Sequence, residues 1–255
     1  LFRDAQALAQ EGKHQDAIGK LRQISDKSDW HERAKSQIGK VLFDSGDLSG
    51  AEREMKAFLE ALGRARVESL ETKAGQNRLI AKALAVFTLG EIAWKRATGA
   101  GEGGAMDMAQ LDEMVQIFTP FPEEFESQTD MVTFAHFYLG RAWTAKGDLA
   151  KAREYYRNLK EIKKRSTLIP NLALAIYIGY EGRVKALAAD SRSTAEARAK
   201  AMREALHFVD EYLDGNPTPQ YAAMFSAFTF ALELKEEKRV LGIADAIKRL
   251  PGKER

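Results

Sequence analysis

The sequence predicts an all-α fold, and three observations support this prediction. Only 6 of the 255 residues are proline. Hydrophobic residues make up 45% of the chain and charged residues 30%, which is enough apolar material for a core and enough charge for a soluble surface. Long stretches consist of Ala, Leu, Glu, Lys and Arg, which lose little entropy in a helix. A recurring pattern of small residues further indicates that the helices come in pairs.

This pattern has three copies, each beginning with a glycine that is followed five residues later by an alanine. The glycines are Gly12, Gly46 and Gly147, and two copies also have an apolar–Gly pair upstream, at 38–39 and 139–140. Small residues on facing helices let the two backbones approach closely. A Gly just past a helix end adopts the left-handed conformation without a Cβ clash, and the Asp after two of these glycines can cap the next helix. The pattern therefore predicts helical hairpins.

We expect twelve helices in six antiparallel hairpins. The expected helices span residues 1–11, 13–25, 29–45, 47–73, 76–97, 105–118, 128–146, 148–164, 168–189, 193–213, 218–234 and 236–250. Two boundaries have additional signals. Ser193 and Glu196 are spaced as a capping box, and Gly215–Asn216–Pro217 should end one helix before Pro219 opens the next.

Residues 38–59 (IGKVLFDSGDLSGAEREMKAFL) and 138–159 (YLGRAWTAKGDLAKAREYYRNL) resemble the tetratricopeptide repeat (TPR). Gly12 and Gly46 are 34 residues apart, the repeat length of that family, whereas Gly46 and Gly147 are 101 apart, so the elements between them must be longer or interrupted. The resemblance implies one TPR-like domain over residues 1–255, a right-handed superhelical solenoid of about six hairpins. Its best repeats are 1–28, 29–65, 76–118 and 130–165, and its divergent hairpins are 168–214 and 218–250.

Charge and cysteine content restrict the function without fixing the compartment. The chain has 39 Lys and Arg against 37 Asp and Glu, so no general field attracts nucleic acid. Cysteine is absent, which fits either the cytoplasm or the periplasm and envelope of a bacterium. No stretch approaches the length of a membrane-spanning helix. The start at Leu1 suggests a trimmed chain.

Patterns that could support catalysis or cofactor binding lack the context they need. Residues 99–104 match G-x-G-x-x-G, but a helix rather than a strand precedes them. Glu204 and His207 have the Glu-x-x-His spacing of carboxylate-bridged metal sites, but no second pair accompanies them. No nucleophile, base and orienting residue can be assembled. We therefore predict a chain that is not an enzyme, with no catalytic residue, cofactor or metal.

The TPR resemblance implies a concave groove lined by the first helix of each hairpin. Counting from the apolar–Gly pairs places one set of residues on the groove face of these helices. The set is Arg33, Lys40, Phe43, Phe87, Glu91, Trp94, Phe137, Arg141, Tyr180 and Arg183. Aromatic and Arg side chains are typical of protein-binding hot spots. The alternative for each aromatic residue is that it packs neighbouring hairpins together.

Three functional hypotheses follow. The first is a non-enzymatic scaffold or adaptor that binds a peptide or helix of a protein partner in the groove. The second is a sensing or oligomerising module of a larger regulatory or cell-envelope assembly protein, and a homo-oligomer belongs to this alternative. The third is an enzyme or nucleic-acid binder that uses the 99–104 loop or basic helix ends, and it is the least supported because the charge is nearly balanced.

Overall fold

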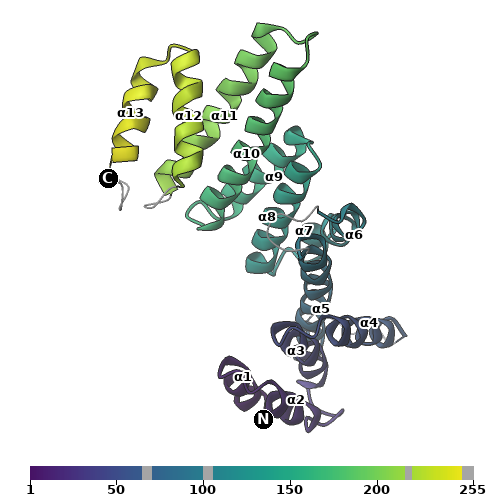
Figure 1. Cartoon of the computed structure of the whole chain (residues 1–255). Coiled ribbons are helices and arrows are strands. Elements are labelled where there is room, and N and C mark those ends of the chain that lie inside the picture. Colours follow the sequence, from purple (N-terminus) through teal and green to yellow (C-terminus); the bar gives the residue numbers. More distant parts are fainter. Residues whose placement is uncertain (65–70, 100–105, 216–219, 249–255) are drawn as a thin grey trace. The chain divides into compact units, whose positions relative to one another are not determined.

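The computed structural model describes residues 1–64, 71–99, 106–215 and 220–248, and helix is the only regular secondary structure in them (Figure 1). The predicted all-α class is confirmed. No helix in this part of the chain is long and apolar enough to cross a membrane. The chain divides into two compact units, unit 1 (Leu1–Ala135) and unit 2 (His136–Arg255).

The helices match the expected order. In the described part of unit 1 they are α1 (Phe2–Gln10), α2 (His14–Arg22), α3 (His31–Asp44), α4 (Leu48–Arg64), α5 (Lys73–Thr98), α6 (Met108–Phe118) and α7 (Phe121–Glu124). The helix α8 (Thr129–Ala145) contains the unit boundary. Unit 2 continues with α9 (Leu149–Ile162), α10 (Leu168–Ala189), α11 (Ala195–Gly215), α12 (Tyr221–Glu233) and α13 (Glu237–Lys248).

Three details differ from the sequence-based expectation. The helix expected over 47–73 corresponds to α4, which ends at Arg64, and α5 begins at Lys73, after Thr72 accepts a hydrogen bond from Gly75 N at 3.0 Å. The short helix α7 was not expected. The cap of α11 is Thr194, whose Oγ1 accepts from Ala197 N at 3.1 Å.

The predicted Ser193–Glu196 capping box is therefore wrong by one residue. The amide of Ser193 donates to the carbonyl of Asp190 at 3.0 Å, in the turn that follows α10. This turn leaves Thr194 as the residue before the first turn of α11. The signals expected at 216–219 lie outside the described residues.

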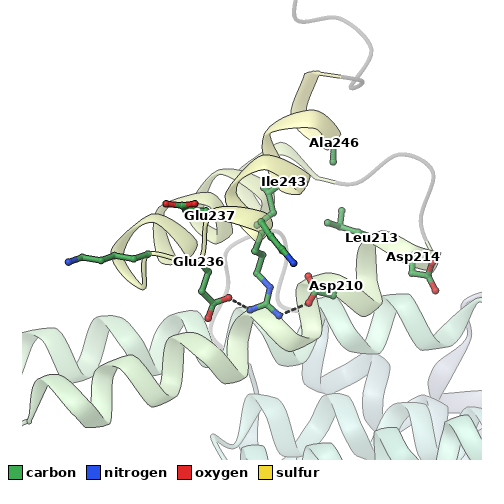
Figure 2. A pocket seen from close by; sticks show the side chains of 11 residues that line it. Asp210, Leu213, Asp214, Glu236, Glu237, Ile243 and Ala246 are labelled. Carbon is green, nitrogen blue, oxygen red and sulfur yellow. Dashed lines mark hydrogen bonds and ion pairs between the residues drawn. The ribbon is translucent and has the colours of Figure 1, made fainter.

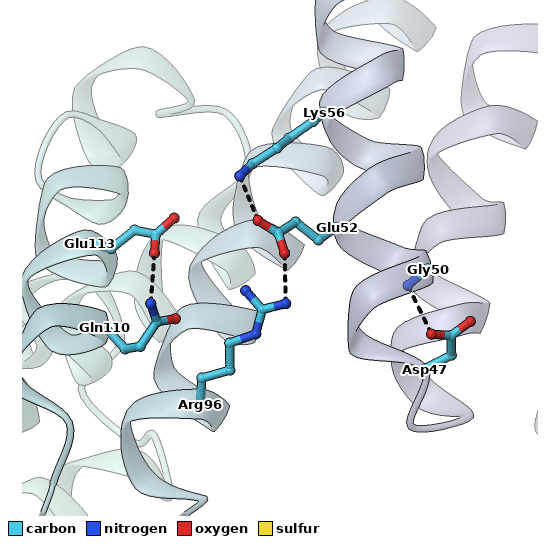
Figure 3. Close-up of polar contacts among 7 residues, drawn as sticks. All are labelled: Asp47, Gly50, Glu52, Lys56, Arg96, Gln110 and Glu113. Carbon is cyan, nitrogen blue, oxygen red and sulfur yellow. Dashed lines mark hydrogen bonds and ion pairs between the residues drawn. The ribbon is translucent and has the colours of Figure 1, made fainter.

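The three turn glycines have the conformation that the sequence predicts. The φ angles of Gly12, Gly46 and Gly147 are 76°, 90° and 78°. At the α3–α4 turn, Gly46 N donates to Phe43 O and Asp47 N donates to Leu42 O, both at 3.0 Å. These two bonds form a Schellman motif, which satisfies carbonyls at the end of α3. The next helix is capped in the predicted way, because Asp47 Oδ1 accepts from Gly50 N at 2.8 Å (Figure 3).

The last hairpin forms the same turn without glycine. Lys235 has a φ of 58°, and its amide donates to Leu232 O at 3.0 Å while Glu236 N donates to Ala231 O at 2.9 Å. The α12–α13 turn is thus also a Schellman motif, with lysine in the left-handed position. A non-glycine residue in this conformation costs about 1–2 kcal/mol. Because the left-handed residue is a lysine and not a glycine, the sequence gives no signal for this turn.

Small residues lie where helices cross, but not always within one hairpin. A Cβ added to Gly39 on α3 would come within 2.7 Å of Met55 Cε on α4, its hairpin partner. A Cβ on Gly140 would instead come within 2.8 Å of Leu172 Cδ2 on α10. The expectation that Gly140 lets the two helices of its own hairpin approach closely is therefore corrected: this glycine permits the approach of α8 and α10.

Each unit has its own hydrophobic core. In unit 1, Ala17, Ile18 and Leu21 of α2 pack with Ala34, Ile38 and Val41 of α3, and Met55 and Phe58 of α4 pack with Ala81 and Ala85 of α5. In unit 2 a continuous cluster extends from α8 to α13. Tyr177 lies inside it, where burial raises its pKa to about 12, and its hydroxyl group is 2.6 Å from Ser226 Oγ on α12.

Ion pairs show how successive hairpins of unit 2 are stacked. Arg153 Nη1 on α9 is 2.6 Å from Glu204 Oε2 on α11, and Lys160 Nζ is 2.7 Å from Glu211 Oε1. The partners are seven residues apart on both helices, in the same direction. The second helices of these two hairpins therefore run parallel, as they do when hairpins stack in one orientation.

Candidate binding surface

Residues from α3 and α5 form a mixed aromatic and charged cluster in unit 1. Lys40 Nζ is 2.6 Å from Asp44 Oδ1, 3.7 Å from Glu91 Oε2 and 4.6 Å from the ring centroid of Phe43. Lys95 Nζ is 5.2 Å from the centroid of the same ring. Both ammonium groups are within the distance of a cation–π interaction. The predicted residues Lys40, Phe43 and Glu91 are thus brought together, and Lys95 joins them.

A second cluster in unit 1 surrounds the start of α3. The guanidinium carbon of Arg33 is 5.0 Å from the ring centroid of Trp30 and 5.5 Å from that of Phe2, and the two rings are 5.1 Å apart. Lys73 Nζ, at the start of α5, is 5.8 Å from the Trp30 ring. Partial burial lowers the pKa of Arg33 from its usual value. Trp30 remains 36% exposed, so a partner can contact the indole.

The sequence analysis missed Phe2, Trp30 and Lys73. Trp30 lies just before α3 and Phe2 belongs to another hairpin, so counting along α3 from its Gly could not include them. One signal in the sequence could have identified Trp30. It lies immediately before a helix and three residues before Arg33, which is a suitable spacing for the guanidinium group to stack on the indole.

Phe87 and Trp94 of α5 have different environments. Phe87 is 7% exposed, and its ring centroid lies 5.4 Å from Phe118, 5.7 Å from Phe121 and 6.4 Å from Phe134. The residue is therefore part of the unit 1 core. Trp94 is partly buried.

The remaining four predicted residues belong to unit 2. Phe137 is 9% exposed, and the guanidinium carbon of Arg141 is 5.6 Å from its ring centroid. Tyr180 is 5% exposed and stacks on Phe208 with ring centroids 6.1 Å apart and planes 16° apart. Arg183 is exposed on α10. For Phe87, Phe137 and Tyr180 the structure shows the packing role that was the alternative to binding.

The two clusters together form what we call the α3–α5 face, and ion pairs hold it in place. Its residues are Phe2, Trp30, Arg33, Lys40, Phe43, Lys73, Glu91 and Lys95. Arg96 Nη2 of α5 is 2.6 Å from Glu52 Oε2 of α4, and Lys56 binds the other carboxylate oxygen (Figure 3). The hydrogen bonds from Lys56 and Arg96 lower the pKa of Glu52. Near the other end of α5, Arg78 Nη2 is 2.9 Å from Glu32 Oε1 of α3. These pairs fix the register of α5 against α3 and α4.

Unit 2 has a large open depression between α11 and α13, with a volume of about 940 Å³ (Figure 2). Arg239 crosses it, with Nη2 2.8 Å from Asp210 Oδ2 and Nη1 bound to Glu236. Asp214 and Glu237 also line it. Because Arg239 already binds two of the carboxylates, we interpret this depression as a structural ion-pair site.

Candidate catalytic and metal-binding patterns gain no support from the structure. In the described part of the chain, no group of three or more His, Asp or Glu side chains could hold a metal ion. Glu204 binds Arg153, and His207 is exposed beside the ring of Phe208 at 5.3 Å. The G-x-G-x-x-G segment falls almost entirely at 100–105, outside the described residues.

Neither the protein-family models nor the curated protein sequences contain a match to this chain. The functional argument therefore depends on the residues of the chain itself.

Proposed function

We propose that this chain is a non-enzymatic, TPR-like scaffold that binds a peptide or helix of a protein partner on the α3–α5 face of unit 1. Support for the repeat comes from hairpin turns at Gly12 and Gly46, one repeat length apart, each with the left-handed glycine. Further support comes from unit 2, where α9 and α11, the second helices of two successive hairpins, run parallel. Protein partners are favoured because aromatic and basic side chains share this face.

The observation that carries the proposal is the pair of clusters along α3. Phe43, partly buried, is flanked by Lys40 and Lys95, and Trp30 is flanked by Arg33 and Lys73. Each cluster presents an aromatic surface beside two cations. Lys40 already pairs with Asp44 and Glu91, so Lys95, Arg33 and Lys73 are the cations that can pair with carboxylates of a partner while its apolar side chains cover the rings.

The experiment compares partner capture by surface variants. A variant with Trp30→Ala, Lys40→Ala and Lys95→Ala should keep the wild-type helical signal but lose the proteins that the wild-type chain captures from a cell lysate, quantified by mass spectrometry. The matched control is Lys27→Ala with Arg53→Ala, two exposed cations of the same unit. The control should capture the same proteins as wild type.

Capture by the triple variant at wild-type strength would reject the α3–α5 face. Equal loss in the control would also reject it, because the partner would then recognise general positive charge. The second hypothesis, an oligomerising module, is favoured by one separate observation, an exposed apolar row on α12.

A further inference from the structure

Helix α12 carries a row of largely exposed apolar residues. Tyr221, Phe225, Phe228 and Leu232 are spaced by four, three and four residues, so they lie along one face of the helix. Tyr221 is 40%, Phe225 55% and Leu232 51% exposed, and Phe228 is partly buried. The rings of Tyr221 and Phe225 stack with centroids 6.1 Å apart. Contiguous exposed apolar surface of this kind marks an interaction site.

Helix α13 carries a second row with the same spacing. It consists of Glu237, Leu241, Ala244 and Lys248, with Leu241 67% exposed. The opposite face of α13 contains Ile243, which is buried in the unit 2 core. This row therefore also faces away from the core, and it differs from the α12 row in having a charge of opposite sign at each end.

The two rows lie on the last hairpin of the described part of unit 2 (Figure 1). Inside the unit, a first helix is covered by the first helix of the following hairpin, as α10 is covered by α12 through Tyr177 and Ser226. In the described part of unit 2, α12 contacts α10, α11 and α13, and none of the three covers the exposed residues of this row. Burying such a row against another surface is favourable.

Both rows are self-complementary under a two-fold rotation. If two copies of α13 pack antiparallel, Glu237 of one copy faces Lys248 of the other, and Leu241 faces Ala244. If two copies of α12 pack antiparallel, Tyr221 faces Leu232 and Phe225 faces Phe228. Antiparallel pairing thus produces two identical ion pairs and an uninterrupted apolar centre.

One axis can serve both rows. Lys235 forms the turn of the hairpin, and the centre of each row lies about eight residues from it, so the two centres are at similar heights along antiparallel helices. A two-fold axis perpendicular to the helices therefore pairs α12 with α12 and α13 with α13 at the same time. We propose that the α12–α13 hairpin is a homodimer interface, in which the rows of two copies form an antiparallel four-helix contact.

Head-to-tail stacking of copies is less well supported than this two-fold contact. It would place the α12 row against the outer face of the first hairpin of another copy. The exposed positions of α1 are mostly polar, namely Arg3, Asp4, Gln6 and Gln10. An apolar row gains little against such a face, whereas a two-fold contact pairs apolar with apolar and closes after two copies. The proposal does not depend on the α3–α5 face.

The first test is the mass of the full chain in solution, measured by sedimentation equilibrium. We expect a monomer–dimer equilibrium, and Phe225→Glu with Leu241→Glu should weaken it at least about tenfold. The control Ala188→Glu with Ala197→Glu adds the same charge at exposed positions of unit 2 and should leave the equilibrium unchanged. Circular dichroism checks that each variant is folded. A wild-type chain that stays monomeric at roughly 100 µM, or a dimer that the Phe225/Leu241 variant retains, overturns the proposal.

The second test concerns the antiparallel register. Glu237→Lys alone should weaken the dimer because it places a second ammonium group opposite Lys248 of the other copy in both ion pairs, and adding Lys248→Glu should restore it. The chain has no cysteine, so single cysteines can be added without background. An equimolar mixture of Glu237→Cys and Lys248→Cys chains should give cross-linked dimers with a short bismaleimide, and Glu237→Cys alone should give few. Equal cross-linking in the two samples, or no restoration by the double charge change, contradicts the register.

Discussion

At the scale of single residues, His136 connects burial with the pH dependence of stability. Its ring is 7% exposed, lies 5.7 Å from the ring of Tyr155 and has lost most of its hydration. Desolvation disfavours the imidazolium and lowers the pKa of His136 below its usual value. Folding therefore holds this side chain in its neutral form.

We predict that the free energy of unfolding decreases as pH falls below about 6.5, the pKa of an unperturbed histidine. The unfolded chain takes up a proton at His136 in that range, whereas the folded chain does so only at lower pH. The contribution of neutral His136 to the free energy of unfolding is therefore fully present above about pH 6.5 and is lost as the pH falls toward the lower pKa of the folded chain. Replacing His136→Phe should flatten this part of the profile, as measured by urea unfolding at several pH values.

The contribution of Glu52 falls in a separate window. Its lowered carboxyl pKa means that its stabilising effect is lost only below about pH 4.3. An unchanged slope between about pH 6.5 and 5 in the His136→Phe variant would contradict the prediction.

Turn residues illustrate how far local sequence determines local structure. Gly46 could be assigned to a left-handed turn because glycine adopts that conformation at no steric cost, and its φ of 90° confirms this. Lys235 could not be assigned, because nothing about a lysine indicates a positive φ. Its conformation accompanies the packing of α13 against α12 and of α12 against α11, which is tertiary information.

At the scale of helices, single glycines determine how closely two neighbouring helices can pack. A Cβ added to Gly90 on α5 would collide with the ring of Phe118 on α6, which is fully buried. The ring has no room to move because Phe87 and Phe121 pack against it. The α5–α6 pair therefore depends on the absence of one methyl group.

We predict that Gly90→Ala destabilises the fold by about 1–3 kcal/mol through overpacking, although alanine favours helix over glycine. Adding Phe118→Leu should make the double variant less destabilised than the sum of the single changes, with a coupling of about 0.5–3 kcal/mol. Gly19→Ala is the control, since Gly19 lies in α2 with nothing within 4 Å of an added Cβ, and it should stabilise by about 0.5–1 kcal/mol. Additive single and double effects in urea unfolding would show that Phe118 does not limit the space.

The sequence predicted which residues share a helix face, but not what covers that face. Phe87 and Phe43 lie on the predicted groove face of α5 and α3, yet Phe87 is buried by the rings of α6 and α7 while Phe43 stays partly exposed between two lysines. The difference arises from α7, a short helix that no periodic pattern predicted. The same limit applies to Phe137 and Tyr180, which the unit 2 core covers.

At the scale of the molecule, the contacts inside each of the two units connect helices that are close in the chain. In the described part of each unit, every substantial contact between helices joins neighbours or next neighbours in sequence, such as α1 with α2, α3 with α5 and α10 with α12. Stability in a chain with neighbour contacts is expected to behave as a sum of local terms.

This architecture predicts that a local defect spreads only over a short distance within unit 1. In the Gly90→Ala variant, hydrogen exchange should accelerate most in α5 and α6, less in α3 and α4, and least in α1, which contacts α2 but has no substantial contact with α5 in the described part. Exchange measured by mass spectrometry on peptides from each helix provides the gradient, with Gly19→Ala as the matched variant. A uniform acceleration from α1 to α6 would mean that unit 1 unfolds as one cooperative domain. Its hairpins would then not behave as separate repeats, and the TPR-like interpretation of this half of the chain would lose its energetic basis.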